Sequence, residues 1–192
     1  MAIDPGLEYA RRLYDRAIDW YKVAEGKAQL LLTVNGAFAA VLFGILSGNV
    51  RDLPDLTRLL GAETWGFLIV AVATFAGAIA SAALCLLSRH NHNIRTDFVR
   101  LGLQPEVPST YRPEVVWYFA HLASLRFDLA VELLRMAGPG FEFQVLTYNV
   151  VGLSRVVLRK HRLINAGWLL TAIALLAMTG AGVSIFLRGQ LR

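Results

Sequence analysis

The chain has 192 residues, of which 56% are hydrophobic and 17% charged, and its formal net charge is +5. Soluble domains contain about 45–50% apolar and about 25% charged residues, so this composition excludes an ordinary soluble domain and a disordered chain. The single cysteine, Cys85, excludes a disulfide scaffold. The basic surplus suits nucleic acid, anionic lipid or membrane topology, and the positions of the basic residues decide between these.

Residues 1–27 predict a cytoplasmic amphipathic helix. At about 100° per residue, Leu7, Tyr14, Ile18 and Tyr21 share one side, and the charged residues share the other. Five acidic residues balance five basic ones, so the helix lacks the cationic face that an anionic leaflet attracts. We therefore expect it to pack against another cytoplasmic helix rather than to lie on the membrane.

Three segments predict transmembrane helices, at residues 28–47, 65–87 and 167–187. None of them contains Asp, Glu, Lys or Arg, and each is long enough to cross a hydrocarbon core of about 30 Å. The expected fold is all-α: an integral membrane protein whose three transmembrane helices extend into a small cytoplasmic helical bundle.

Lysine and arginine are unevenly distributed along the chain. Residues 1–27 hold five, the 48–64 loop two, residues 88–163 ten and the 188–192 tail two. Because cytoplasmic flanks carry the excess of basic residues, we expect the amino terminus and the 88–163 segment in the cytoplasm. The loop and the tail are then extracytoplasmic.

The 88–163 segment predicts further helices. We expect the second span to continue as a helix past Leu87 until an irregular, proline-rich connection. A helix should follow over residues 113–136, where the Gly-Pro-Gly sequence at 138–140 stops it. The last helix should begin near Glu142 and run directly into the third span.

Arg126 falls within an apolar stripe of the expected 113–136 helix. The stripe consists of Val115, Phe119, Leu122, Leu129 and Leu133, and the opposite polar face of His121, Asp128, Glu132 and Arg135. A buried guanidinium needs an anion or carbonyl oxygens. Two interpretations stay open: a structural salt bridge or a guanidinium that reaches the bundle edge, and an arginine that binds an anionic ligand.

The expected last helix carries an apolar packing stripe opposite a basic face. The stripe is Leu146, Val150, Leu153 and Val157, and the basic face is Gln144, Tyr148, Arg155, Arg159 and Arg162. Arg159, Lys160 and Arg162 lie within two turns of the third span, where anionic headgroups suit them. Arg155 lies further from the span, so an anionic ligand suits it better.

No catalytic or metal-binding motif is present. The sequence has no GxSxG, P-loop or HExxH pattern, and His90 and His92, two residues apart, point to different helix faces. We therefore expect no enzyme, no catalytic residue, no cofactor and no metal. The spans also lack the ionisable residues of proton- or ion-coupled transporters, which argues against transport.

Small residues recur every four positions in the first two spans. They are Gly36, Ala40 and Gly44 in the first, and Ala73, Gly77 and Ser81 in the second. Such ridges let helices approach closely. They can pack the two spans together within one chain or pack several chains into a homo-oligomer, which we expect for so small a membrane domain.

Both ends of the chain resemble the Pycsar membrane effectors. Their opening pattern of an aromatic, an acidic residue, Lys-Ala, aliphatics and Asn-Gly is similar to WYKVAEGKAQLLLTVNGAFAAVLFGIL, with Glu25 where Asp is usual. The residues that carry this likeness are Trp20, Ala24, Lys27, Ala28, Leu31, Asn35 and Gly36. The segment FQVLTYNVVGLSRVVLRKHRLINAGW is similar to their carboxy-terminal part, with a Gln, spaced aliphatics and a Lys that leads into the last span.

The resemblance implies an antiphage effector of the bacterial inner membrane that binds cyclic CMP or cyclic UMP, made on infection by a partner pyrimidine cyclase. Binding would disrupt the membrane and halt the infected cell, which is abortive infection. The basic cytoplasmic segment can supply guanidinium and stacking groups for such a ligand. The ligand-binding candidates are Arg126, Arg155, Arg159, Tyr148 and Lys27, with Tyr111, Trp117 and Tyr118 as further stacking groups. We expect no nucleic-acid polymer as a partner.

Two other readings of the sequence stay open. The chain can be a small membrane accessory subunit whose cytoplasmic helices dock a partner protein without any nucleotide. It can also be an enzyme that works at the membrane surface, although no nucleophile, base or metal cluster supports this.

Overall fold

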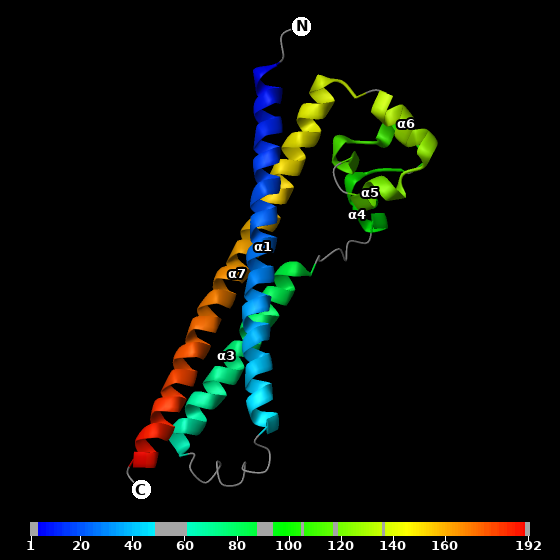
Figure 1. The fold of residues 1–192 in the computed structure, drawn as a ribbon. Coiled ribbons are helices and arrows are strands. Elements are labelled where there is room, and N and C mark those ends of the chain that lie inside the picture. The colour runs from blue at the N-terminus through cyan, green and yellow to red at the C-terminus, as the bar shows by residue number, and fades with distance from the viewer. Residues whose placement is uncertain are drawn as a thin grey trace. The chain divides into compact units, whose positions relative to one another are not determined.

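The computed structural model describes residues 4–48, 61–87, 94–104, 106–116, 119–135 and 137–190, and all regular structure within these ranges is helical. The elements in chain order are α1 (Pro5–Gly48), α3 (Ala62–Leu86), α4 (Ile94–Leu101), η2 (Pro108–Thr110), η3 (Pro113–Val116), α5 (Phe119–Ser124), α6 (Phe127–Arg135) and α7 (Pro139–Gln190) (Figure 1). The described part of the chain therefore confirms the all-α class. His90, His92, Trp117, Tyr118 and most of the 48–64 loop lie outside the described residues.

The helices form two compact units. The first unit comprises Met1–Lys22 and Arg89–Leu158, and the second Val23–Ser88 and Arg159–Arg192. The two long helices, α1 and α7, contribute residues to both units. This continuity confirms that the amino-terminal helix runs on into the 28–47 segment and that the last helix runs on into the 167–187 segment.

In the first unit, α4 ends in a Schellman motif centred on Gly102. Its φ of 68° lies in the left-handed region, where a residue without Cβ is favoured. The N–H of Gly102 donates to the carbonyl of Val99 at 3.1 Å, and that of Leu103 to the carbonyl of Phe98 at 2.8 Å. Phe98 and Leu103 then pack with Val115 in one buried cluster, so the motif turns the chain from α4 toward η3.

The single helix expected over 113–136 is wrong. The segment divides into η3, α5 and α6, and the chain is not helical at Leu125 and Arg126. The break changes which residues face inward: His121, expected on a polar face, is buried with its ring centroid 5.7 Å from that of Phe98. Leu122, expected in the apolar stripe, is exposed.

The first turn of α7 is joined to α1 by a bidentate ion pair. Pro139 begins the helix, a position where its missing N–H and fixed φ cost nothing. Glu142 lies in this turn, and its Oε1 and Oε2 accept from Nε and Nη2 of Arg11 at 2.7 and 2.8 Å. The Gly-Pro-Gly sequence therefore separates α6 from α7, and the last helix begins three residues earlier than expected.

In α1, buried and half-buried positions recur alternately three and four residues apart. This stripe comprises residues 7, 10, 14, 17, 21, 24, 28, 31 and 35, and Ile18 is half-buried beside it. This is the spacing that keeps one stripe of a helix against a neighbouring helix. The expected inner side, with Leu7, Tyr14, Ile18 and Tyr21, is thereby confirmed, and alanines at 10, 17, 24 and 28 extend it.

The second unit packs α1, α3 and α7 around small and polar side chains. Its hydrophobic centre is Ala24, Ala28, Cys85 and Ile164. Buried polar groups join the helices: Asn35 Nδ2 donates to Thr171 Oγ1 at 3.1 Å, and Ser81 Oγ to the carbonyl of Leu163 at 2.6 Å. Interhelical hydrogen bonds of this kind are typical where no water is present to satisfy polar groups.

Two helices, α3 and α7, contain segments long and apolar enough to cross a membrane. They include the expected third span and all of the expected second span except Leu87. Residues 28–47 belong to α1, and their role as a further span stays a prediction. The helix expected to continue past Leu87 is wrong, because α3 ends at Leu86 and Leu87 is extended with a ψ of 111°.

Candidate functional site

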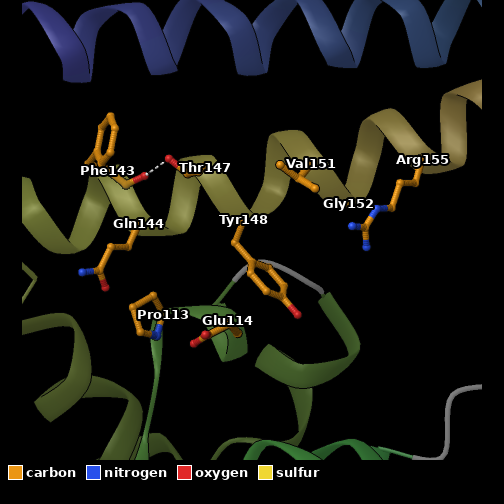
Figure 2. Close-up of a pocket in the computed structure, with 9 residues that line it drawn as sticks. All are labelled: Pro113, Glu114, Phe143, Gln144, Thr147, Tyr148, Val151, Gly152 and Arg155. Carbon is orange, nitrogen blue, oxygen red and sulfur yellow. Dashed lines mark hydrogen bonds between the residues drawn. The ribbon is translucent and has the colours of Figure 1, made fainter.

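A groove of about 530 Å³ lies within the first unit, between η3 and the first part of α7. Pro113 and Glu114 of η3 line one wall, and residues of α7 between Phe143 and Arg155 line the other (Figure 2). Sites for small molecules usually enclose about 300–1,000 Å³. The groove therefore has the volume to hold a ligand of mononucleotide size.

One face of α7 supplies the polar side chains of the groove. Gln144, Tyr148, Gly152 and Arg155 are spaced four, four and three residues apart, which places them within about 80° around the helix. Figure 2 shows Gln144, Tyr148 and Arg155 extending toward η3, while Phe143 extends to the other side of the helix. Gly152 has no side chain, so this face is open between Tyr148 and Arg155.

Several polar groups in the groove have unused hydrogen-bonding capacity. Oε2 of Glu114 is buried and accepts no hydrogen bond from the described residues. Gln144 and Arg155 make neither a hydrogen bond through their side chains nor an ion pair within the described ranges. Because buried polar atoms are almost always paired in native proteins, an unpaired carboxylate oxygen in a groove marks a place for a hydrogen-bond donor.

The structure brings two of the five predicted ligand residues together. Tyr148 and Arg155 both line the groove, seven residues apart on α7. At a rise of about 1.5 Å per residue, their backbones are separated by about 10 Å along the helix axis. An aromatic ring and a guanidinium at this separation can contact the two ends of one nucleotide.

Arg126 is not buried in an apolar stripe, contrary to the sequence-based expectation. It immediately precedes α6, is exposed, and its Nη2 lies 2.9 Å from Oδ2 of Asp128. The hydrogen bond between the two side chains raises the pKa of Arg126 and lowers that of Asp128. Of the two interpretations, the geometry matches a salt bridge, with a partner two residues away rather than on another helix.

Lys27 and Arg159 are exposed residues of the second unit and do not line the groove. Lys160 differs more from expectation, because only 7% of it is exposed and its Nζ lies 2.8 Å from Oε1 of Glu25. The headgroup interpretation is therefore wrong for Lys160. Ligand binding by Arg126, Arg159 and Lys27 stays a prediction without support from the groove.

The two small-residue ridges differ in their surroundings. Gly36, Ala40 and Gly44 are exposed, and a Cβ on either glycine would meet no atom within 4 Å. In the second ridge, Ala73 is exposed, whereas a Cβ on Gly77 would lie 3.1 Å from Cδ1 of Leu170 and Ser81 is buried. The second ridge thus packs against α7 within the second unit, and the first leaves an unpartnered surface on the described chain.

Sequence reasoning missed Glu114 as a groove residue and Gly167 as a position of close helix packing. Glu114 could not be recognised, because no pattern along the chain shows that η3 faces α7. A Cβ on Gly167 would collide with the side chain of Leu31. The heptad spacing of Lys160, Ile164, Gly167 and Thr171 was the available signal for Gly167.

Comparison with known proteins identifies a protein family. A family model described as PycTM, Pycsar effector protein domain, matches residues 9–188. No curated protein and no solved structure matches the chain. The matched range includes most of both units and all residues of the groove. The protein is therefore a membrane protein of the Pycsar effector family, and membership in that family implies an antiphage effector role.

Proposed function

We propose that the groove between η3 and α7 binds a cyclic pyrimidine mononucleotide, cyclic CMP or cyclic UMP, and that binding triggers disruption of the bacterial inner membrane. The observation that carries the proposal is the guanidinium of Arg155, which has no partner among the described residues and shares one groove face with Tyr148. Family membership supports the same class of ligand, since Pycsar effectors act with nucleotides that a cyclase produces.

Arg155 suits the phosphate of such a ligand. A cyclic phosphodiester carries one negative charge and two exocyclic oxygens, and a guanidinium forms two parallel hydrogen bonds with such a group. Two other arginines of the first unit, Arg11 and Arg126, already form ion pairs with carboxylates of the protein. Arg155, in contrast, makes no ion pair within the described ranges, so its guanidinium can bind an anion from outside the protein.

Tyr148 suits the base. Its ring lines the groove next to the open face left by Gly152, so a planar base can lie against it. Stacking on an aromatic side chain contributes about 1–3 kcal/mol per base and tolerates either pyrimidine. With the base on Tyr148 and the phosphate at Arg155, a nucleotide lies lengthwise along α7.

The ligand would act on the membrane through α7, which carries the groove residues and continues to Gln190. A ligand shifts a conformational equilibrium only if it binds one state more tightly. We propose that the nucleotide favours a state in which helices of the second unit assemble with those of other copies. The unpartnered ridge of Gly36, Ala40 and Gly44 supports such assembly.

Calorimetric titration of the detergent-solubilised protein with cyclic CMP and cyclic UMP tests the binding step. Arg155→Ala should lower the affinity at least about tenfold, because a charge-assisted hydrogen bond contributes about 1.5–3 kcal/mol. Arg135→Ala is the matched control: it removes an exposed arginine of the same unit that lies outside the groove, and it should bind as the wild type does. Equal affinity of the wild type and Arg155→Ala would contradict the assigned site.

Leakage from dye-loaded vesicles tests the membrane step. Vesicles that contain the wild-type protein should release dye when a nucleotide that the protein binds is added. Vesicles that contain Arg155→Ala should release dye only at a higher nucleotide concentration. Absence of both binding and leakage would refute the proposed function. It would favour the accessory subunit that docks a partner protein.

A further inference from the structure

We infer that Glu114 makes the groove selective for cytosine over uracil, so that cyclic CMP is the cognate ligand. The inference rests on the proposed function and names which of the two pyrimidine nucleotides it concerns. Its starting point is the unpaired Oε2 of Glu114, a buried hydrogen-bond acceptor on a residue that lines the groove. A ligand that fills the groove must give this oxygen a donor or leave it unpaired.

Glu114 is placed to meet the edge of a base rather than its face or its phosphate. It lies on η3, across the groove from α7, and Figure 2 shows it below Tyr148 and on the side away from Arg155. A base that lies against Tyr148, with its phosphate toward Arg155, directs its polar edge to η3. A carboxylate beside the phosphate would repel the ligand, so this separation from Arg155 is a requirement of the arrangement.

The two pyrimidines differ in what they present at that edge. Cytosine carries an exocyclic amino group at position 4, which is a hydrogen-bond donor, whereas uracil carries a carbonyl oxygen there. A carboxylate accepts from the amino group and is the side chain expected opposite it in base recognition. Facing uracil, the same oxygen meets a second acceptor, so both atoms stay unpaired.

Uracil has one other donor on this edge, the N–H at position 3, but it is flanked by two carbonyl oxygens. A carboxylate that approaches it brings its second oxygen close to one of them. Removal of the partner of a buried polar group costs more than the hydrogen bond itself contributes. Discrimination of at least about tenfold in favour of cyclic CMP is therefore expected.

Gln144 supports the same geometry without adding selectivity. Its amide lines the groove and makes no side-chain hydrogen bond with the described residues. An amide both donates and accepts, so it can contact the carbonyl at position 2, which the two bases share. Of the groove side chains beside Tyr148, only the carboxylate of Glu114 can accept without also donating.

The test is titration of the full-length protein in detergent with cyclic CMP and cyclic UMP, which differ only at positions 3 and 4 of the ring. Wild-type protein should bind cyclic CMP at least about tenfold more tightly. Glu114→Gln should reduce this ratio to within about threefold, because an amide presents a donor to uracil and an acceptor to cytosine. Glu132→Gln, the same change at an exposed position of α6 outside the groove, should keep the wild-type ratio.

The outcomes separate this inference from the proposed function. Equal or tighter binding of cyclic UMP by the wild type, or an unchanged preference in Glu114→Gln, would overturn the role of Glu114 and leave nucleotide binding standing. If the wild type binds neither nucleotide, the proposed function fails and the inference fails with it. Circular dichroism of Glu114→Gln establishes that any lost preference occurs in a folded protein.

Discussion

Removal of the Glu25 carboxylate should destabilise the second unit more than removal of an exposed charge. Lys160 and Glu25 form an ion pair at 2.8 Å, and their side chains are 9% and 35% exposed. Exposed ion pairs contribute about 0.2–1 kcal/mol, whereas removal of one partner from a buried pair costs about 3–5 kcal/mol. Because the ammonium is buried and the carboxylate is partly exposed, we expect Glu25→Gln to lower the free energy of unfolding by about 2 kcal/mol.

That change corresponds to a melting temperature lower by about 4–8 °C for a chain of this length. The chain provides its own reporter, because its single cysteine, Cys85, is free, buried and packed in the same cluster as Ala24, Ala28 and Ile164. A thiol-reactive dye should therefore label Cys85 only when the second unit opens. The rise of labelling with temperature measures the stability of the helices around the ion pair.

A double-mutant cycle distinguishes the ion pair from a general effect of charge. Lys160→Met removes the buried cation, so Glu25→Gln combined with Lys160→Met should be more stable than Glu25→Gln alone. Arg159→Met is the matched control: it removes a neighbouring but exposed charge, and it should change stability by less than about 0.5 kcal/mol. If Glu25→Gln behaves as Arg159→Met does, or if the two changes simply add, the reasoning on this pair is refuted.

Three further predictions concern contacts and surfaces of the same helices. The hydrogen bond from Arg11 lowers the pKa of Glu142. Their ion pair therefore stabilises the folded state fully above the ordinary carboxyl pKa of about 4.3, and this stabilisation is lost as the pH falls through the lower pKa of the folded protein. The melting temperatures of wild type and Arg11→Gln should differ at neutral pH and converge below about pH 4. Thr171→Val removes the interhelical partner of the buried Asn35 amide, which keeps its bond to the Leu31 carbonyl, and it should cost about 1 kcal/mol in the Cys85 labelling assay. A change within error would contradict a structural role for that hydrogen bond. Gly36→Leu and Gly44→Leu fill an exposed surface, so they should leave the protomer stable but abolish the homo-oligomer that chemical cross-linking detects. Gly167→Leu should instead destabilise the protomer itself. If the oligomer persists in both Gly36→Leu and Gly44→Leu, that ridge is excluded as the interface.

Long, continuous patterns in the sequence predicted the helices that carry them. Both α1 and α7 were expected as uninterrupted helices because amphipathic periodicity passes directly into an apolar run, and the inner side of α1 followed from the same periodicity. The 113–136 segment failed for a local reason. Periodicity alone does not show a break at Leu125 and Arg126, and after a break each short helix turns its faces independently of the next.

The groove was predictable only in its α7 wall. Tyr148 and Arg155 share a helix face, which spacing shows, but Glu114 reaches them from another element, and single-sequence patterns do not place one element against another. The sequence also did not show which small residues of α1 are buried. Alanine contributes little to an apolar stripe, so Ala24 and Ala28, each fully buried, were less visible in the sequence than Gly36 and Gly44, which are exposed.

The residues that carry the family resemblance are mostly packing residues of the second unit. Ala24, Ala28, Leu31 and Asn35 are all fully buried on one stripe of α1. The acidic residue of the first motif, Glu25, pairs with Lys160 of the second motif, so the two ends of the chain that resemble the family hold each other.

The first motif lies in α1, and the second also supplies the α7 wall of the groove, including Gln144, Tyr148 and Arg155. The packed residues of the first motif and the Glu25–Lys160 pair that joins the two motifs form an interlocking set. Gln144, Tyr148 and Arg155 lie outside that interlocking set, and Glu114 lies outside both motifs. A change of groove residues can therefore alter ligand preference while the helices of the second unit stay the same. Cyclic nucleotide specificity in this chain should then follow the residue at position 114, which is why the Glu114→Gln titration is more informative than any further comparison of the motifs.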